Sequence, residues 1–167
     1  SARPPARSFS AAGLCEAENG IKFLNAQGMK LSESQEQALE AYLASLPEGA
    51  LNLPETGRRV DGSQYYELYL QDLLATQKDL DLSGLKILLD CSNGASHRIG
   101  PELFRRLGAE VIALHTESDG VNINVQSGSE YARSKPQALA ALIAERRADF
   151  AITFDGDADR VILMDEN

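Results

Sequence analysis

Tryptophan is absent from this 167-residue sequence, and cysteine and histidine each occur only twice. Cys15 and Cys91 cannot build a disulfide framework, which favours a reducing, cytoplasmic compartment. Two histidines give little support to a zinc site or to a Ser-His-Asp triad. No apolar run approaches the roughly 20 residues of a membrane span. Residues 1–10 are basic and rich in Ser and Ala, with a weak transit-peptide character, but lack the apolar core of a secretory signal.

Positive charge is scarce as well: 16 basic residues face 25 acidic ones, for a formal charge of -9. A nucleic-acid partner needs a basic face, so the composition argues against one. Anionic small molecules would need a local metal or arginine site. The hydrophobic share of 43% is ordinary for a globular protein.

The second half of the chain alternates between short apolar runs and helical patterns. Strands are expected at 85–90, 110–114 and 149–154, with helices at 101–107 and 134–146, the second capped by Ser134. This β-α-β-α-β order predicts an α/β fold with a parallel sheet, flanking helices and right-handed crossovers.

The first half is predicted to hold two helices separated by a loop at 47–60. Ser32 and Gln35 form a capping-box pattern before a helical stripe that ends near Pro47. A second helix with a broad apolar face, rich in tyrosine, is expected at 63–75. We expect both helices to serve packing rather than chemistry.

Three alternating aspartates follow the last predicted parallel strand. Asp155, Asp157 and Asp159 repel one another unless a cation holds them, and hard oxygen ligands suit Mg²⁺, Ca²⁺ or Mn²⁺. Gly156 would allow a tight turn, and Arg160 adds a planar cation suited to a phosphate. The loop would lie at the carboxyl end of its strand, where ligands bind in open α/β sheets.

An acidic run of this kind also occurs in solvated turns and in EF-hand loops. The sequence alone does not exclude that this loop is a solvated acidic turn. An EF-hand is disfavoured, because counting from Asp155 puts Arg160 at the sixth position, where such loops need glycine. The run that follows, 161–164, is also strand-like rather than loop-like.

Two further loops carry weaker signals. Residues 92–97 follow a predicted strand, so their backbone N–H groups could face an anion, although a tight βα turn is slightly favoured. His97 is expected to face solvent, and His115 ends a strand without an identifiable partner.

The acidic loop resembles the metal loop of the α-D-phosphohexomutases, and within that superfamily the bacterial phosphoglucosamine mutases. Five segments agree in the same order: Asn19-Gly-Ile-Lys-Phe23, 85–95, Leu107-Gly-Ala-Glu-Val111, Asp119-Gly-Val-Asn-Ile-Asn124 and Phe154-Asp-Gly-Asp-Ala-Asp-Arg-Val161. The resemblance covers roughly residues 10–166.

The resemblance implies a Mg²⁺-dependent transfer of phosphate between the 6- and 1-hydroxyls of a hexosamine through a phosphoserine. Asp155, Asp157 and Asp159 would hold Mg²⁺, Arg160 would bind a phosphate, and Lys22 would act as acid or base. Residues 1–80 would be the end of domain I with a linker helix, and 81–167 most of domain II. The family's third and fourth domains would be missing.

The sequence departs from the family at the phosphoserine loop. Ala12 stands where the phosphorylated serine is expected, and alanine has no hydroxyl. Ser10 could replace it only if the loop carried about two extra residues. Residues 127–136 also depart from the family pattern, with an expected insertion of about four residues.

Three hypotheses therefore follow. The first is a segment of a phosphohexomutase, inactive alone, which would bind a sugar phosphate and self-associate through an exposed sheet edge. Its sugar stays open, with phosphomannomutase or phosphoglucomutase as alternatives. The second is a degenerate metal-binding paralogue or interaction module. The third is a phosphatase-like α/β domain with Asp155 or Asp157 as nucleophile.

Overall fold

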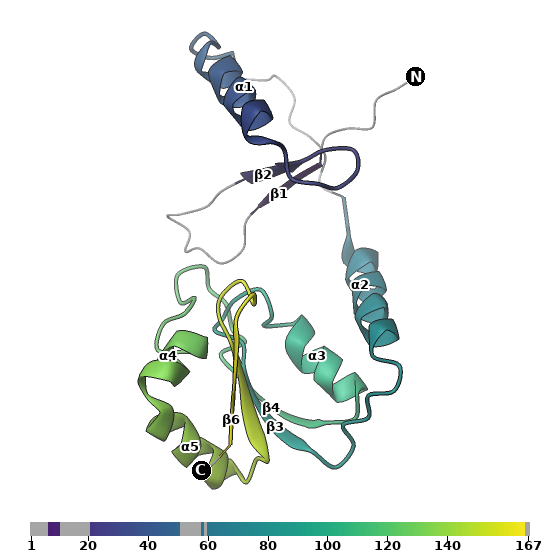
Figure 1. Cartoon of the computed structure of the whole chain (residues 1–167), viewed down its shortest axis with the longest axis vertical. Coiled ribbons are helices and arrows are strands. Elements are labelled where there is room, and N and C mark those ends of the chain that lie inside the picture. The colour runs from purple at the N-terminus through teal and green to yellow at the C-terminus, as the bar shows by residue number, and fades with distance from the viewer. Residues whose placement is uncertain (1–6, 11–20, 51–57, 59, 166–167) are drawn as a thin grey trace. The chain divides into compact units, whose positions relative to one another are not determined.

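The computed structural model describes residues 7–10, 21–50, 58 and 60–165. The chain divides into two compact units (Figure 1). The first holds β1 (Arg7–Ser10), β2 (Ile21–Leu24) and α1 (Glu33–Ala44). The second begins its described part with α2 (Ser63–Thr76) and contains every later element.

In the first unit, β1 and β2 form an antiparallel pair in which Phe9 lies opposite Lys22. The capping prediction for α1 is confirmed: Ser32 precedes the helix, and its backbone N–H donates to Gln35 Oε1 at 3.0 Å. The packing of α1 is slight among the described residues, because no residue of this helix is fully buried, Leu39 is half-buried, and Tyr42 and Leu43 are exposed.

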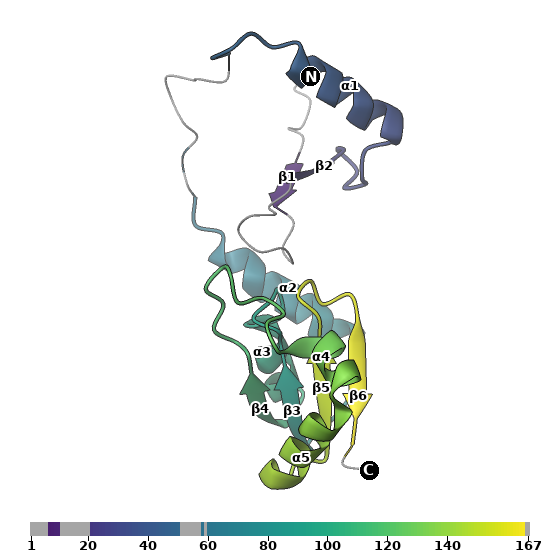
Figure 2. The same ribbon diagram turned by 90° about the vertical axis from the view of Figure 1, so that its left-hand side faces the viewer.

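The second unit is built on a four-stranded sheet of order β4-β3-β5-β6 (Figure 2). β3 (Lys86–Asp90) pairs in parallel with both β4 (Glu110–Leu114) and β5 (Phe150–Phe154), as predicted. β6 (Val161–Met164) adds to β5 in antiparallel orientation. A short loop such as the one between β5 and β6 permits only that orientation, whereas parallel strands need long crossovers.

Helices cover both faces of this sheet (Figures 1 and 2). α2 and α3 (Ile99–Arg106) lie on one face, and α4 (Gly128–Ser134) and α5 (Pro136–Arg146) lie on the other. Because both faces are buried, β3 is apolar along most of its length rather than alternating.

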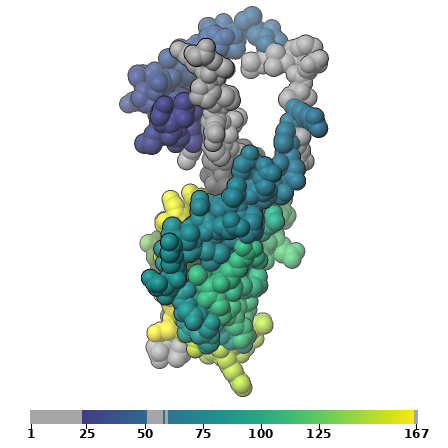
Figure 3. Space-filling model, turned by 90° about the vertical axis from the view of Figure 1, so that its right-hand side faces the viewer, coloured from purple at the N-terminus to yellow at the C-terminus, as the bar shows by residue number. Residues whose placement is uncertain are grey.

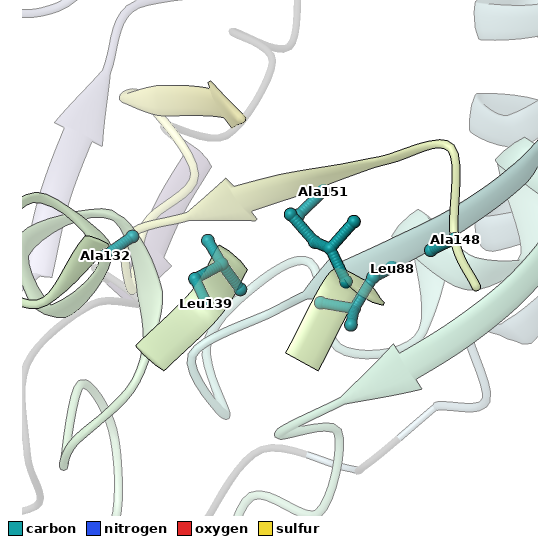
Figure 4. Packing of buried hydrophobic residues seen from close by; sticks show 6 residues of the cluster. Leu88, Ala132, Leu139, Ala148 and Ala151 are labelled. Carbon is teal, nitrogen blue, oxygen red and sulfur yellow. The ribbon is translucent and has the colours of Figure 1, made fainter. Parts of the chain in front are cut away.

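Alternate side chains of β3 belong to two separate hydrophobic clusters. Leu88 packs with Ala132, Leu139 and Ile143 on the side of α4 and α5 (Figure 4). Ile87 and Leu89 pack with partly buried Phe104 on the side of α3. The side chains of β3 therefore pack against helices on both faces of the sheet.

The predicted helix that ends near Arg146 forms, but the prediction that Ser134 caps it is wrong. Ser134 is the last residue of α4, a helix that occupies much of the segment interpreted as an insertion. α5 begins at Pro136, and Lys135 between the two helices has φ -137° and ψ 58°. Proline lacks an N–H and keeps the preceding residue out of the helical region, so the chain breaks there.

α2 belongs with the sheet domain, whereas the sequence pattern placed the boundary near residue 80. Arg106 of α3 holds both carboxylate oxygens of Glu67, at 2.7 and 3.0 Å. The Arg98 guanidinium lies 4.1 Å from the centroid of the Tyr66 ring. Leu70 is fully buried. Figure 3 shows α2 lying along this face of the unit.

The tyrosine-rich face of α2 is only partly core. Tyr66 is half-buried, but Tyr65, Leu68 and Tyr69 are exposed. Within the described residues, no helix is long and apolar enough to cross a membrane.

Candidate metal centre

The three aspartates come together in the loop that joins β5 to β6. Asp155 directly follows β5 and is 3% exposed, whereas Asp157 and Asp159 are exposed. One carboxylate oxygen from each lies within 4.8 Å of those from the other two. A cation of the Mg²⁺ or Ca²⁺ type prefers such oxygen ligands, so the donor set fits one.

The loop holds this shape through its own backbone. Ala158 N–H donates to the Asp155 carbonyl at 3.1 Å, and Asp155 N–H donates to the Arg160 carbonyl at 3.3 Å. Ala158 takes a left-handed conformation with φ 60°. These bonds turn the chain within a few residues, so that alternate side chains converge.

Gly156 is needed for a reason other than the predicted tight turn. Its φ is not in the left-handed region, but a Cβ there would lie 2.7 Å from Ile123 Cδ1 and 2.8 Å from Asn124 Nδ2. Glycine lets the acidic loop pack directly against the 122–124 segment.

Arg160 contacts the acidic loop itself. Its Nε and Nη2 both lie 2.7 Å from Asp155 Oδ2, and its backbone N–H donates to Asp155 Oδ1 at 3.1 Å. Its Nη1 lies 3.2 Å from Glu130 Oε1. The predicted metal ligand and the predicted phosphate ligand therefore neutralise each other here.

The carboxylates of the loop differ in acidity. Burial raises the pKa of Asp155, but the backbone N–H and guanidinium of Arg160 outweigh it and leave that pKa below its usual range. Although Asp157 is exposed, partial desolvation and the negative charges of Asp155 and Asp159 raise its pKa. A bound cation would relieve that repulsion.

Asp90, which sequence reasoning missed, supports the site from the end of β3. It is 5% exposed. Its Oδ1 accepts the Ser92 N–H at 2.9 Å and lies 2.9 Å from His115 Nδ1, and its Oδ2 accepts the Gly128 N–H at 2.8 Å. A buried carboxylate needs such donors. An aspartate closing an apolar strand was the available signal.

His115 thus has a partner, which the sequence did not reveal. The hydrogen bond with Asp90 raises the pKa of His115, although partial burial acts in the opposite direction.

The loop after β3 is a tight turn, as favoured from the sequence. Gly94 N–H donates to the Cys91 carbonyl at 2.8 Å, and Ala95 N–H donates to the Gly156 carbonyl at 2.7 Å. Those two amides are therefore already occupied. The turn serves to hold the acidic loop in place.

The three remaining predicted positions lie in the first part of the chain. Ser10 ends β1 and Lys22 lies in β2, where the structure describes the backbone only. Ala12 lies outside the described residues. The roles of Ser10 and Lys22 stay predictions.

Comparison with known proteins identifies the family of the sheet domain. The protein-family model described as phosphoglucomutase/phosphomannomutase, α/β/α domain II, matches residues 67–167 of this sequence. The chain belongs to this phosphohexomutase family. The matched segment begins at Glu67, inside α2, so it includes the part of that helix whose Glu67 pairs with Arg106 of α3.

Within this family the chain is most like phosphoglucosamine mutases. It is 44% identical over 154 residues to the phosphoglucosamine mutase of Caulobacter vibrioides, covering 90% of this chain and 33% of the relative. It is 41% identical over 155 residues to that of Natranaerobius thermophilus, covering 89% and 33%. The chain thus spans about a third of the length of these relatives.

A solved structure agrees on the fold. A phosphoglucomutase/phosphomannomutase family protein from Burkholderia thailandensis matches with a TM-score of 0.67 and 24% identity, over 95% of this chain and 33% of that protein.

Proposed function

We propose that this chain is a segment of a Mg²⁺-dependent phosphohexomutase that converts glucosamine 6-phosphate to glucosamine 1-phosphate. The convergence of three carboxylate oxygens within 4.8 Å, in the loop that the family motif marks, carries this proposal. The likeness to phosphoglucosamine mutases supports the sugar, with mannose and glucose phosphates as alternatives.

Each residue of the site has a separate role in this proposal. Asp155, Asp157 and Asp159 hold the cation, which when bound supplies electrostatic stabilisation to a transferring phosphoryl group. If the cation took the Asp155 carboxylate, Arg160 would be available to bind a phosphate oxygen, for which its planar fork is suited. Lys22 exchanges a proton with the reacting hydroxyl.

We do not expect this chain to be active by itself. Ala12 occupies the expected phosphoserine position, and Ser10 offers the nearest hydroxyl on the N-terminal side of it. The chain also spans about a third of its relatives. The same substitution favours a second candidate, a degenerate metal-binding paralogue.

Metal binding is tested first, by titrating the chain with Mg²⁺ in a calorimeter. We expect the wild type to bind, Asp157→Asn to lose most of its affinity, and Asp72→Asn, a carboxylate on α2, to match the wild type. Equal binding by all three proteins would reduce the loop to a solvated acidic turn.

Phosphoryl transfer is tested by intact mass after incubation with glucosamine 1,6-bisphosphate and Mg²⁺, followed by mapping of residues 8–15. One added phosphate on Ser10 would mean that its hydroxyl oxygen has taken the phosphoryl group and the sugar oxygen has taken the proton. Metal binding without that phosphate would favour the degenerate paralogue. A phosphate on Asp155 or Asp157 would indicate the phosphatase-like mechanism.

We also propose a cytoplasmic location, without nucleic-acid or membrane partners, and self-association through the sheet edge. The edge strand β6 exposes Val161 by 54% and Leu163 by 66%. Sedimentation velocity of Leu163→Glu against the wild type tests the last point, and unchanged sedimentation coefficients would contradict it.

A further inference from the structure

A basic hollow lies beside the first crossover helix, away from the acidic loop. It is open to solvent, measures about 380 Å³ and is lined by His97, Arg98, Pro101, Arg105, Ala113 and Thr116. It shares no residue with the acidic loop. β3 separates β4, which contributes Ala113, from β5, which the aspartates follow.

The charge of the hollow stands out against the net charge of -9. Among the residues that the structure describes, no carboxylate lines it. Arg98 and Arg105 likewise form no ion pair with any described residue, whereas the neighbouring Arg106 is held by Glu67 and Glu102. Two guanidinium groups are thus free to take an anionic ligand.

The basic side chains are positioned before any ligand arrives. Arg98 stacks over Tyr66 at 4.1 Å from its centroid, which holds the guanidinium plane while its edge N–H groups stay available. His97 Nδ1 lies 2.9 Å from the Gly94 carbonyl, so its ring orientation is set by the βα turn. Ordered donors lose less entropy on binding.

The spacing of the arginines fits a phosphate group. Arg98, the N-cap residue of α3, and Arg105 are seven residues apart, about two turns or 10 Å along the helix axis, on the same face. Long side chains can converge from such positions. Pro101 and Ala113 are apolar and small and leave room between them, and Thr116 adds a hydroxyl.

We propose that this hollow, the Arg98–Arg105 site, binds the phosphate of a small phosphomonoester such as a sugar phosphate. Guanidinium groups match phosphate oxygens in two-point hydrogen bonds, which makes them better suited to this anion than to a halide or a single carboxylate oxygen. The site is additional to the phosphate role proposed for Arg160 and does not need Mg²⁺.

The test uses the full chain with Arg160→Gln, without divalent cations, so that the acidic loop does not contribute. Glucose 6-phosphate, inorganic phosphate and glucose are titrated separately while backbone amide shifts are followed by NMR. We expect glucose 6-phosphate to move the amides of Arg98 and Thr116 at millimolar concentrations, and glucose to move neither.

Substitutions then show which side chains bind the phosphate. Arg105→Gln is expected to weaken binding of glucose 6-phosphate by about tenfold or more, as for loss of a charge-assisted hydrogen bond. Arg146→Gln, an equal charge change on α5, should have little effect. Arg105 is exposed and unpaired with any described carboxylate, so folding should persist, and circular dichroism checks this.

Each remaining outcome decides the proposal. Inorganic phosphate binding as tightly as glucose 6-phosphate would limit the site to the free anion and overturn the phosphomonoester assignment. Absence of binding, or equal weakening by Arg105→Gln and Arg146→Gln, would overturn the site itself. Neither result bears on Mg²⁺ binding by the acidic loop, which is measured separately.

Discussion

At the scale of single residues, the Arg160 guanidinium occupies a carboxylate oxygen of Asp155 that a metal ion would also use. Arg160 Nε and Nη2 both lie 2.7 Å from Asp155 Oδ2. A metal bound by the three aspartates would have to displace this guanidinium or share the carboxylate with it. The acidic loop is therefore already neutralised in part before a metal binds.

Removing this competitor should strengthen metal binding. We expect Arg160→Gln to raise the affinity for Mg²⁺ by about threefold to tenfold, because a partly exposed ion pair is lost. Calorimetry measures the change, with Arg146→Gln as the charge-matched control. An unchanged or lower affinity in Arg160→Gln would show that Arg160 does not oppose the metal.

The His115–Asp90 pair gives a pH-dependent prediction. The pKa of His115 in the folded state lies above its usual value of 6.5, so protonation stabilises the fold. The contribution is complete below that unfolded value and is lost as pH rises through the higher folded value. The wild type should thus exceed His115→Gln in free energy of unfolding by more at about pH 5.5 than at about pH 9.

Urea denaturation at several pH values checks this prediction. In an Asp90→Asn background the gap between the two proteins should no longer be larger at the lower pH, because the carboxylate that raises the pKa is gone and only the opposing effect of burial is left. A pH-dependent gap of the same size in that background would assign the effect to another group.

At the scale of elements, the start of α4 is locked against the ends of β3 and β5. Gly128 has φ +76°, and a Cβ there would clash with the Ser92 hydroxyl and the Phe154 carbonyl. Ser92 Oγ itself donates to that carbonyl at 2.6 Å. The helix therefore begins where the two strands end, beside the acidic loop.

Gly128→Ala should lower the free energy of unfolding by about 2 to 5 kcal/mol, combining a left-handed Cβ penalty with overpacking. Gly120→Ala is the matched control, since it has φ +91° but no atom within 4 Å of an added Cβ. It should lose only about 1 to 2 kcal/mol. Equal losses in denaturant titrations would exclude the packing term.

At the scale of the whole molecule, the position of α2 decides where the sheet domain begins. The ion pair of Glu67 with Arg106, the stacking of Arg98 on Tyr66 and the burial of Leu70 tie this helix to α3. A boundary near residue 80 would remove all three interactions.

Three truncated chains test this boundary. A chain of residues 63–167 should unfold cooperatively in urea, whereas residues 81–167 should be less stable by several kcal/mol, as expected when a buried leucine and its neighbours are lost. Restoring only part of the helix, residues 71–167, should not recover stability. Equal midpoints and slopes for all three would make α2 a mere linker.

Local pattern was sufficient for much of the sheet domain. The apolar runs at β3, β4 and β5 and the alternation with helices indicated a parallel sheet, because each run is long enough only for a buried strand. The spacing of Asp155, Asp157 and Asp159 indicated a shared oxygen site, since alternate residues in a tight loop can converge.

Tertiary structure decided what depends on distant partners. Asp90 contacts His115 and Gly128 only because the end of β4 and the start of α4 lie beside it in the folded chain. Gly156 is required by the 122–124 segment, and Arg160 is drawn to Asp155 and Glu130. Sequence by itself determined most elements of the sheet domain, although not α4, and which oxygens meet. Packing between segments far apart in the chain decided their partners, because burial and charge depend on neighbours in space.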